Sequence, residues 1–209
     1  MKMESYPLKI VVIHDGLIPK IDPLLVELGN KFGEESVIHF ENSNKGLEYV
    51  LDNLNQKMVV LLDINFSHGE LSGIQVFEDI KKRTALVYVI MITARSLNEI
   101  SHPDLITMIN HDAMAIENVF NYPKIIELVE KAAHKMETRV DSALEQWINS
   151  HSEADRERPY LTTRTGKVYT LTQILDEIRL QTPYGQEMEG NILMLAIDLL
   201  ARGKKEIND

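Results

Sequence analysis

Apolar residues in the first two thirds of the chain fall into short continuous runs, separated by polar stretches. The central run is MVVLLDIN at 58–65, which leads straight into a carboxylate, Asp63. Short runs rich in β-branched residues are typical of strands buried on both faces of a sheet. The runs predict five strands, at 9–14, 36–40, 58–64, 86–93 and 114–116.

Between these runs, apolar residues recur every three or four positions, as on one face of a helix. Asn44, for example, is expected to cap a helix over 45–54. Alternating strands and helices predict right-handed crossovers, and therefore a doubly wound parallel sheet covered by helices on both faces. The predicted helices cover 21–32, 45–54, 74–82, 96–101 and 105–110, with a break at 102–103, and a long one runs from 122 to about 151.

The last third of the chain has a different pattern and predicts a small, mostly α-helical module with one β-hairpin. The hairpin strands are expected at 160–163 and 168–170, after a polar linker at 150–159. Thr170 is expected to cap a helix over 171–180, and a turn at 182–185 leads to a final helix over 186–202. Trp147 is interpreted as a core or interface residue. The sequence thus predicts two domains, 1–135 and 136–209.

Composition narrows the function classes. The 209 residues include no cysteine, which excludes disulfides, thiolate nucleophiles and cysteine-ligated metals. No apolar run is long enough to span a membrane, and the N-terminus lacks a signal peptide's apolar core, so a cytoplasmic location is expected. A net charge of −10 argues against a broad, non-specific grip on nucleic acid.

Polar residues end three of the predicted strands: Asp15 beside His14, then Asp63, then Thr93. The carboxyl ends of parallel strands share one edge of the sheet, where open α/β folds place their sites. These side chains are therefore expected to converge.

With these residues, positions 8 to about 134 resemble the receiver (CheY-like) domain of two-component response regulators. The resemblance implies a flavodoxin-like five-stranded sheet and phosphorylation of Asp63 by a sensor histidine kinase or phosphotransfer protein. It also implies Mg²⁺ bound by Asp15, Asp63 and the backbone carbonyl of Asn65, and a phosphoryl contact made by Thr93 as the switch residue. The motifs that carry it are KIVVIHDG, VVLLDIN, the glycine of LSGIQVFEDI, and VIMITA. Such chemistry is coherent, because a carboxylate can attack a phosphoryl donor while a cation stabilises the developing charge.

The chain also departs from the family's pattern. His14 stands where the family has a first acid and is interpreted as a neutral packing residue rather than a metal ligand. Asn118 stands where the family has a phosphate-pairing lysine. Segment 113–118 has no aromatic switch residue. Ala94 and Arg95 are expected at the pocket, where Arg95 could partly replace the lysine's charge. Two interpretations stay open: an atypical regulator phosphorylated on Asp63, or a pseudo-receiver adaptor that is not phosphorylated.

The loop after Asp63 is about two residues longer than the family's, and His68 or Glu70 could reach over the pocket. A phosphate-hydrolysing enzyme using Asp15 and Asp63 with magnesium is disfavoured, because no further acid or general base accompanies them; a non-enzyme is expected.

The module at 136–209 is expected to bind an unknown downstream protein or a second copy of the chain. DNA binding is less favoured, because the second of its last two helices would begin with Gln186, Glu187 and Glu189. The hairpin's Arg164 and Lys167 keep that alternative open.

Overall fold

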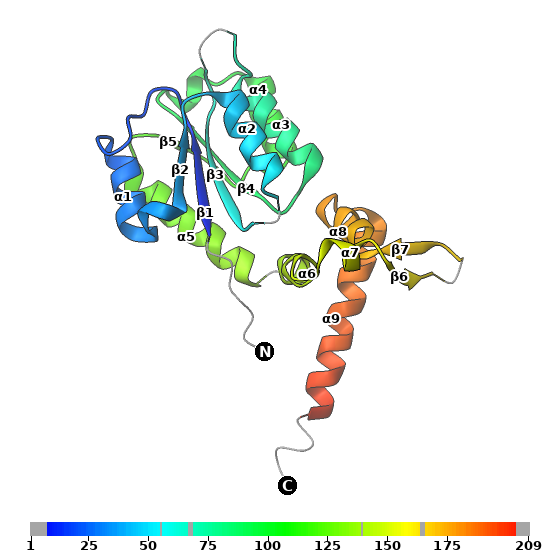
Figure 1. The fold of residues 1–209 in the computed structure, drawn as a ribbon. Coiled ribbons are helices and arrows are strands. Elements are labelled where there is room, and N and C mark those ends of the chain that lie inside the picture. Colours follow the sequence, from blue (N-terminus) through cyan, green and yellow to red (C-terminus); the bar gives the residue numbers. More distant parts are fainter. Residues whose placement is uncertain (1–7, 55, 67–68, 139, 164–165, 204–209) are drawn as a thin grey trace. The chain divides into compact units, whose positions relative to one another are not determined.

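The five predicted strands form one parallel sheet in the computed structural model, which describes residues 8–54, 56–66, 69–138, 140–163 and 166–203 (Figure 1). The chain divides into two compact units, 1–137 and 138–209. The sheet lies in the first unit and has the strand order β2-β1-β3-β4-β5. Its strands are β1 (Lys9–Ile13), β2 (Val37–Phe40), β3 (Met58–Asp63), β4 (Tyr88–Thr93) and β5 (Ala115–Asn118).

The helices of the first unit cover both faces of the sheet (Figure 1). One face carries Val60 and Leu62 of β3 and packs against α2, α3 and α4. The other face carries Val59 and Leu61 and packs against α1 and α5. All six residues of β3 are buried, which explains why its sequence is a continuous apolar run rather than an alternating one. The helices are α1 (Pro23–Phe32), α2 (Ser43–Asp52), α3 (Gly73–Arg83), α4 (His102–Asn110) and α5 (Tyr122–Thr138), with 3₁₀ turns η1 (Glu34–Ser36) and η2 (Leu97–Glu99).

Two predicted helix starts were wrong. Asn42, not Asn44, caps α2, because the Asn42 side chain accepts a hydrogen bond from the backbone N–H of Lys45. Pro103 does not break a helix; it occupies the first turn of α4, where a missing N–H costs nothing. The cap of α4 is Ser101, whose hydroxyl accepts a hydrogen bond from the N–H of Asp104.

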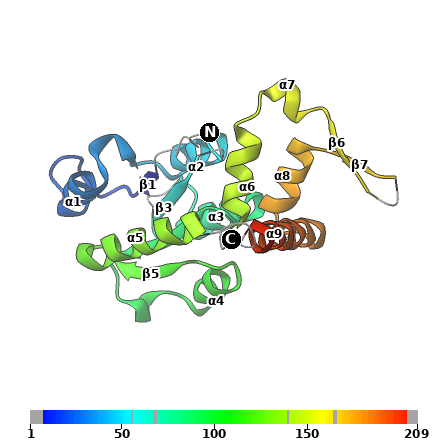
Figure 2. The same ribbon diagram turned by 90° about the horizontal axis from the view of Figure 1, so that it is seen from below.

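The second unit is built from helices and one antiparallel hairpin (Figure 2). Its core consists of apolar residues of α6, β7 and α8: Ile148, Tyr169, Leu171, Ile174, Leu175 and Ile178. Arg179 of α8 pairs with Glu145 of α6 at 2.7 Å, and both side chains are largely buried. The elements are α6 (Val140–Asn149), α7 (Glu153–Arg156), β6 (Pro159–Thr162), β7 (Val168–Thr170), α8 (Leu171–Arg179) and α9 (Pro183–Gly203).

The structure confirms the hairpin strands and the cap of α8, where Thr170 and Gln173 form a reciprocal capping box. It corrects three other expectations. The stretch 122–151 holds two helices, α5 and α6, and the expected linker contains α7. Pro183 begins α9 instead of lying in a turn. Trp147 was expected in a core or at an interface; it is 42% exposed and therefore lies outside the core, and the interface stays a prediction.

None of the helices described here combines the length and the apolar character needed to cross a membrane.

Candidate functional site

The register of the sheet brings the predicted polar residues to one edge. Ile13 pairs with Leu62, so the next residues, His14 and Asp63, lie side by side where their strands end. Thr93, at the end of β4, pairs with Asn118 at the end of β5. The sequence correctly predicted that these strand ends converge.

Asp63 is a buried carboxylate, only 6% exposed. Its Oδ1 accepts a hydrogen bond from the backbone N–H of Asn65 at 3.3 Å. Burial, with a smaller contribution from the nearby charge of Asp15, raises the pKa of Asp63 to about 6, against the opposing effect of backbone N–H groups. The carboxyl group therefore titrates just below neutral pH. Its ionised form is poorly solvated in the pocket, so binding of a cation or reaction with an electrophile is favourable there.

Gly73 fixes the backbone around Asp63. A Cβ atom at Gly73 would lie 1.8 Å from the carbonyl oxygen of Asp63, so only glycine allows α3 to begin this close to the strand. The Gly73 N–H donates to the carbonyl of Ile64 at 3.1 Å. The glycine of the LSGIQVFEDI motif thus holds the loop that follows the acid.

His14 lies between the two carboxylates. Its Nε2 is 3.7 Å from Oδ2 of Asp63, and its Nδ1 is 4.0 Å from Oδ1 of Asp15. The Gly16 N–H donates to the same Nδ1 at 2.9 Å. Burial lowers the pKa of His14, so the imidazole is neutral near pH 7.

His14, Asp15 and Asp63 each offer one ligand atom, and these atoms lie within 4.8 Å of one another. Mg²⁺ prefers oxygen ligands and commonly binds one or two carboxylates together with waters and phosphate oxygens. The two aspartates fit that preference, and Asp15 faces solvent as an exposed residue. The imidazole nitrogen of His14 is a poor match for magnesium.

No family model and no curated protein matches the chain, but solved structures do. Solved structures that match include the response regulator TrrA of Thermotoga maritima, solved in complex with Mg²⁺-BeF, with 24% identity and a TM-score of 0.44 over 59% of this chain and 97% of that one. A CheY-like receiver domain of Methanospirillum hungatei matches with 19% identity and a TM-score of 0.45 over 62% and 98%. The N-terminal domain of a response regulator/sensory box/GGDEF protein of Carboxydothermus hydrogenoformans matches with 17% identity and a TM-score of 0.47 over 62% and 96%.

The strand order of this chain decides the fold, because 2-1-3-4-5 is the doubly wound order of flavodoxin and CheY. The first unit has the flavodoxin-like fold of receiver domains. We call it the receiver unit from here on, and the pocket at the ends of β1 and β3 the Asp63 pocket.

The remaining predicted residues line the β4 and β5 side of that edge. Thr93 is fully buried, and its hydroxyl accepts a hydrogen bond from the Arg95 N–H at 3.1 Å. Arg95 is exposed, and its charge lowers the pKa of Asp63, though less than the other influences. Ala94 is also exposed. Arg95 therefore supplies a positive charge that acts on Asp63 in this structure.

Asn118 does not replace the missing lysine in charge, and its side-chain oxygen is engaged within its own loop. Its Oδ1 accepts a hydrogen bond from the Phe120 N–H at 3.0 Å, which stabilises its own loop. Its backbone N–H donates to the carboxylate of Glu117 at 2.8 Å. Asn118 is also the last residue of β5, whereas the sequence placed it after that strand.

Glu70, which was suggested to reach over the pocket, instead contacts the N-terminus of α2. Its carboxylate accepts a hydrogen bond from the Ser43 N–H at 2.7 Å, at the N-terminus of α2, where a negative charge is favourable. His68 lies outside the described residues. The longer loop after Asp63 thus helps to cap a neighbouring helix through Glu70.

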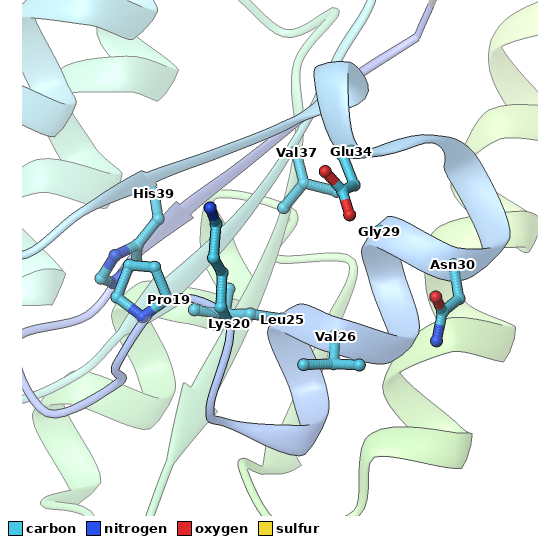
Figure 3. A pocket seen from close by; sticks show the side chains of 9 residues that line it. All are labelled: Pro19, Lys20, Leu25, Val26, Gly29, Asn30, Glu34, Val37 and His39. Carbon is cyan, nitrogen blue, oxygen red and sulfur yellow. The ribbon is translucent and has the colours of Figure 1, made fainter.

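A second concavity was missed by sequence reasoning. It is an open hollow of about 480 Å³ between α1 and β2, and Figure 3 shows the side chains of Lys20 and His39 on the same side of it. The ring of His39 also contacts the carbonyl oxygen of His14 at 2.9 Å. A histidine in the short strand VIHF was the only signal for this hollow in the sequence.

Proposed function

We propose that the chain is an atypical response regulator that accepts a phosphoryl group on Asp63 and signals through protein–protein contacts. The observation that carries this proposal is the buried Asp63 carboxylate at the end of β3, clustered with Asp15 inside a receiver fold. The receiver fold alone does not establish phosphorylation, because a fold can host several functions.

In the proposed reaction, the carboxylate Oδ2 of Asp63 attacks the phosphorus of a phosphohistidine on a sensor kinase or phosphotransfer protein. The new O–P bond forms as the P–N bond breaks, and the electron pair of that bond stays on the imidazole nitrogen. The product is an acyl phosphate on Asp63. Oδ2 is proposed as the attacking oxygen, and Oδ1 accepts the Asn65 N–H.

Asp15 and Asp63, with the backbone carbonyl of Asn65, would hold a magnesium ion. When bound, the ion would neutralise part of the negative charge on the phosphoryl oxygens. Asp15 also acts without the ion, because its charge favours the protonated form of Asp63. Thr93 holds its hydroxyl beside the same edge and is proposed as the switch residue that contacts the phosphoryl group.

The second unit is proposed as the part that contacts a downstream protein or a second copy of the chain. Its helix α9 exposes apolar side chains at Leu193, Met194, Leu195 and Ile197, each between 45% and 65% exposed. Exposed apolar groups of this kind are typical of protein-binding surfaces. Of the two hairpin residues that kept DNA binding open, Lys167 lies over the ring of Tyr169 and Arg164 lies outside the described residues.

Intact-mass spectrometry after incubation with acetyl phosphate and Mg²⁺ tests the proposal. The wild type is expected to gain one phosphoryl group, and Asp63→Asn is expected to gain none. Glu48→Gln, which removes an exposed acid on α2, is the matched control and should react like the wild type. An unmodified wild type would favour the second candidate, a pseudo-receiver adaptor, which the neutral residues His14 and Asn118 would suit.

A further inference from the structure

His14 has an unsatisfied nitrogen in the Asp63 pocket. The residue is 8% exposed, and its Nε2 has no hydrogen-bond partner among the described residues. The nearest charged atom recorded for it is Oδ2 of Asp63 at 3.7 Å, which is too long for a hydrogen bond. Buried polar atoms are nearly always paired, so an unpaired one calls for an explanation such as a ligand.

The backbone of Gly16 decides which ring nitrogen carries the proton. An amide N–H can only donate, and that of Gly16 points at Nδ1 from 2.9 Å. Nδ1 must therefore present its lone pair. In a neutral imidazole the proton then sits on Nε2.

This tautomer excludes one role for His14 and favours another. A protonated Nε2 has no lone pair for a metal ion, and the lone pair of Nδ1 already accepts the Gly16 N–H, so His14 does not complete the metal site suggested by the cluster with Asp15 and Asp63. A protonated Nε2 is a hydrogen-bond donor, and it faces the oxygen of Asp63 that the Asn65 N–H leaves free.

We propose that His14 is a phosphoryl-binding residue, whose Nε2–H donates to an oxygen of the phosphoryl group on Asp63. The inference rests on the proposed function and adds a residue to it. The family's lysine would make such a contact, but Asn118 is turned to the Phe120 N–H. His14 thus supplies a donor from β1 where the chain lacks a cation at the end of β5.

The tautomer can be measured directly in the unmodified protein. In ¹⁵N NMR of the full chain, the two ring nitrogens of His14 are expected to show Nε2 protonated and Nδ1 unprotonated near neutral pH. The reverse assignment would overturn the inference, because Nε2 would then carry a lone pair and could not donate to a phosphoryl oxygen. This measurement does not depend on phosphorylation.

Binding of beryllofluoride, a phosphoryl mimic, then tests the role. With Mg²⁺ present, His14→Leu is expected to bind it about tenfold or more weakly than the wild type, the usual loss for a hydrogen bond to a charged group. His14→Gln keeps an N–H donor of similar reach and should bind within a few-fold of the wild type. Amide spectra of both variants check that the receiver unit stays folded, and the Gln variant is informative even if the Leu variant unfolds.

The outcomes separate this inference from the proposed function. If the wild type itself takes up no beryllofluoride, the proposed function fails and the inference fails with it. If the wild type binds it and His14→Leu binds equally well, only the inference fails. Equal losses in His14→Leu and His14→Gln would also overturn it, because packing rather than a donor would then explain the effect.

Discussion

Replacing Asp63 by asparagine should stabilise the receiver unit, and only above the pH at which Asp63 ionises. The pKa of this carboxyl rises from 3.8 in an exposed side chain to about 6 in the folded chain. Each pKa unit corresponds to about 1.4 kcal/mol, so keeping Asp63 ionised in the fold costs about 3 kcal/mol. The cost is absent below pH 3.8, grows between pH 3.8 and 6, and is complete above about pH 7.

Asparagine has the same shape and carries no charge, so Asp63→Asn removes this cost. Burying the new amide group subtracts part of the gain. We expect the variant to be about 2 kcal/mol more stable than the wild type at pH 8, and no more stable at pH 4.5. Magnesium should stabilise the wild type at pH 8 by mass action and have little effect on the variant.

Hydrogen exchange of the β3 amides is the suitable assay, because it reports on the receiver unit separately from the second unit. Glu48→Gln controls for the loss of a negative charge at an exposed position. A stability difference of the same size at pH 4.5 and pH 8 would refute the reasoning, since it would arise from packing and not from ionisation. Direct ¹³C titration of the Asp63 carboxyl would show which of the two applies.

Three other substitutions test the framework around the site and the second unit. Gly73→Ala places a methyl group 1.8 Å from the Asp63 carbonyl oxygen, so we expect a loss of about 3 kcal/mol and a lower Tm; an unchanged Tm would contradict the close approach. Arg179→Ala removes the ion pair with the largely buried Glu145 and should cost about 3 kcal/mol by urea unfolding followed through tryptophan fluorescence, whereas replacing both by apolar residues should cost less. Thr170→Ala removes the cap of α8 and should cost about 1 kcal/mol in the same assay, and an unaltered midpoint would show that the cap is dispensable.

The sheet could be predicted from the sequence because its central strands are buried on both faces and therefore read as apolar runs. The edge strand β5 was predicted less well. Its last residues, Glu117 and Asn118, are polar, and they belong to the strand because Ile92 and Thr93 of β4 pair with them. Pairing partners of this kind are set by the tertiary fold and leave no mark in a local pattern.

Helix starts were harder to predict where two capping residues compete. Asn42 and Asn44 both precede the apolar positions of α2, and either could cap it by type alone. The loop after β3 decides between them, since Glu70 binds the Ser43 N–H and the side chain of Asn44 accepts the Leu71 N–H at 3.3 Å. A contact between residues 27 positions apart cannot be predicted from the local sequence.

At the candidate site, the sequence predicted which residues converge but not how they are oriented. The strand-end positions of His14, Asp63 and Thr93 follow from the alternation of strands and helices. The tautomer of His14 does not, because it depends on where the Gly16 N–H points. The direction of the Asn118 amide also depends on a loop N–H, that of Phe120.

The two departures from the receiver pattern compensate each other in charge. An acid at position 14 would add a negative charge beside Asp63, and a lysine at position 118 would add a positive one. With His14 neutral and Asn118 uncharged, the pocket keeps the same net charge as a pocket with both family residues. Losing the lysine alone would raise the pKa of Asp63 further and disfavour its ionised, nucleophilic form. Losing the acid at position 14 as well removes its repulsion of the Asp63 carboxylate. An uncharged pair at positions 14 and 118 is therefore a coherent alternative to the charged pair. In the proposed function, cation binding would be weaker because one carboxylate is lost, and the Nε2–H of His14 is proposed to contribute a hydrogen bond to the phosphoryl oxygens instead.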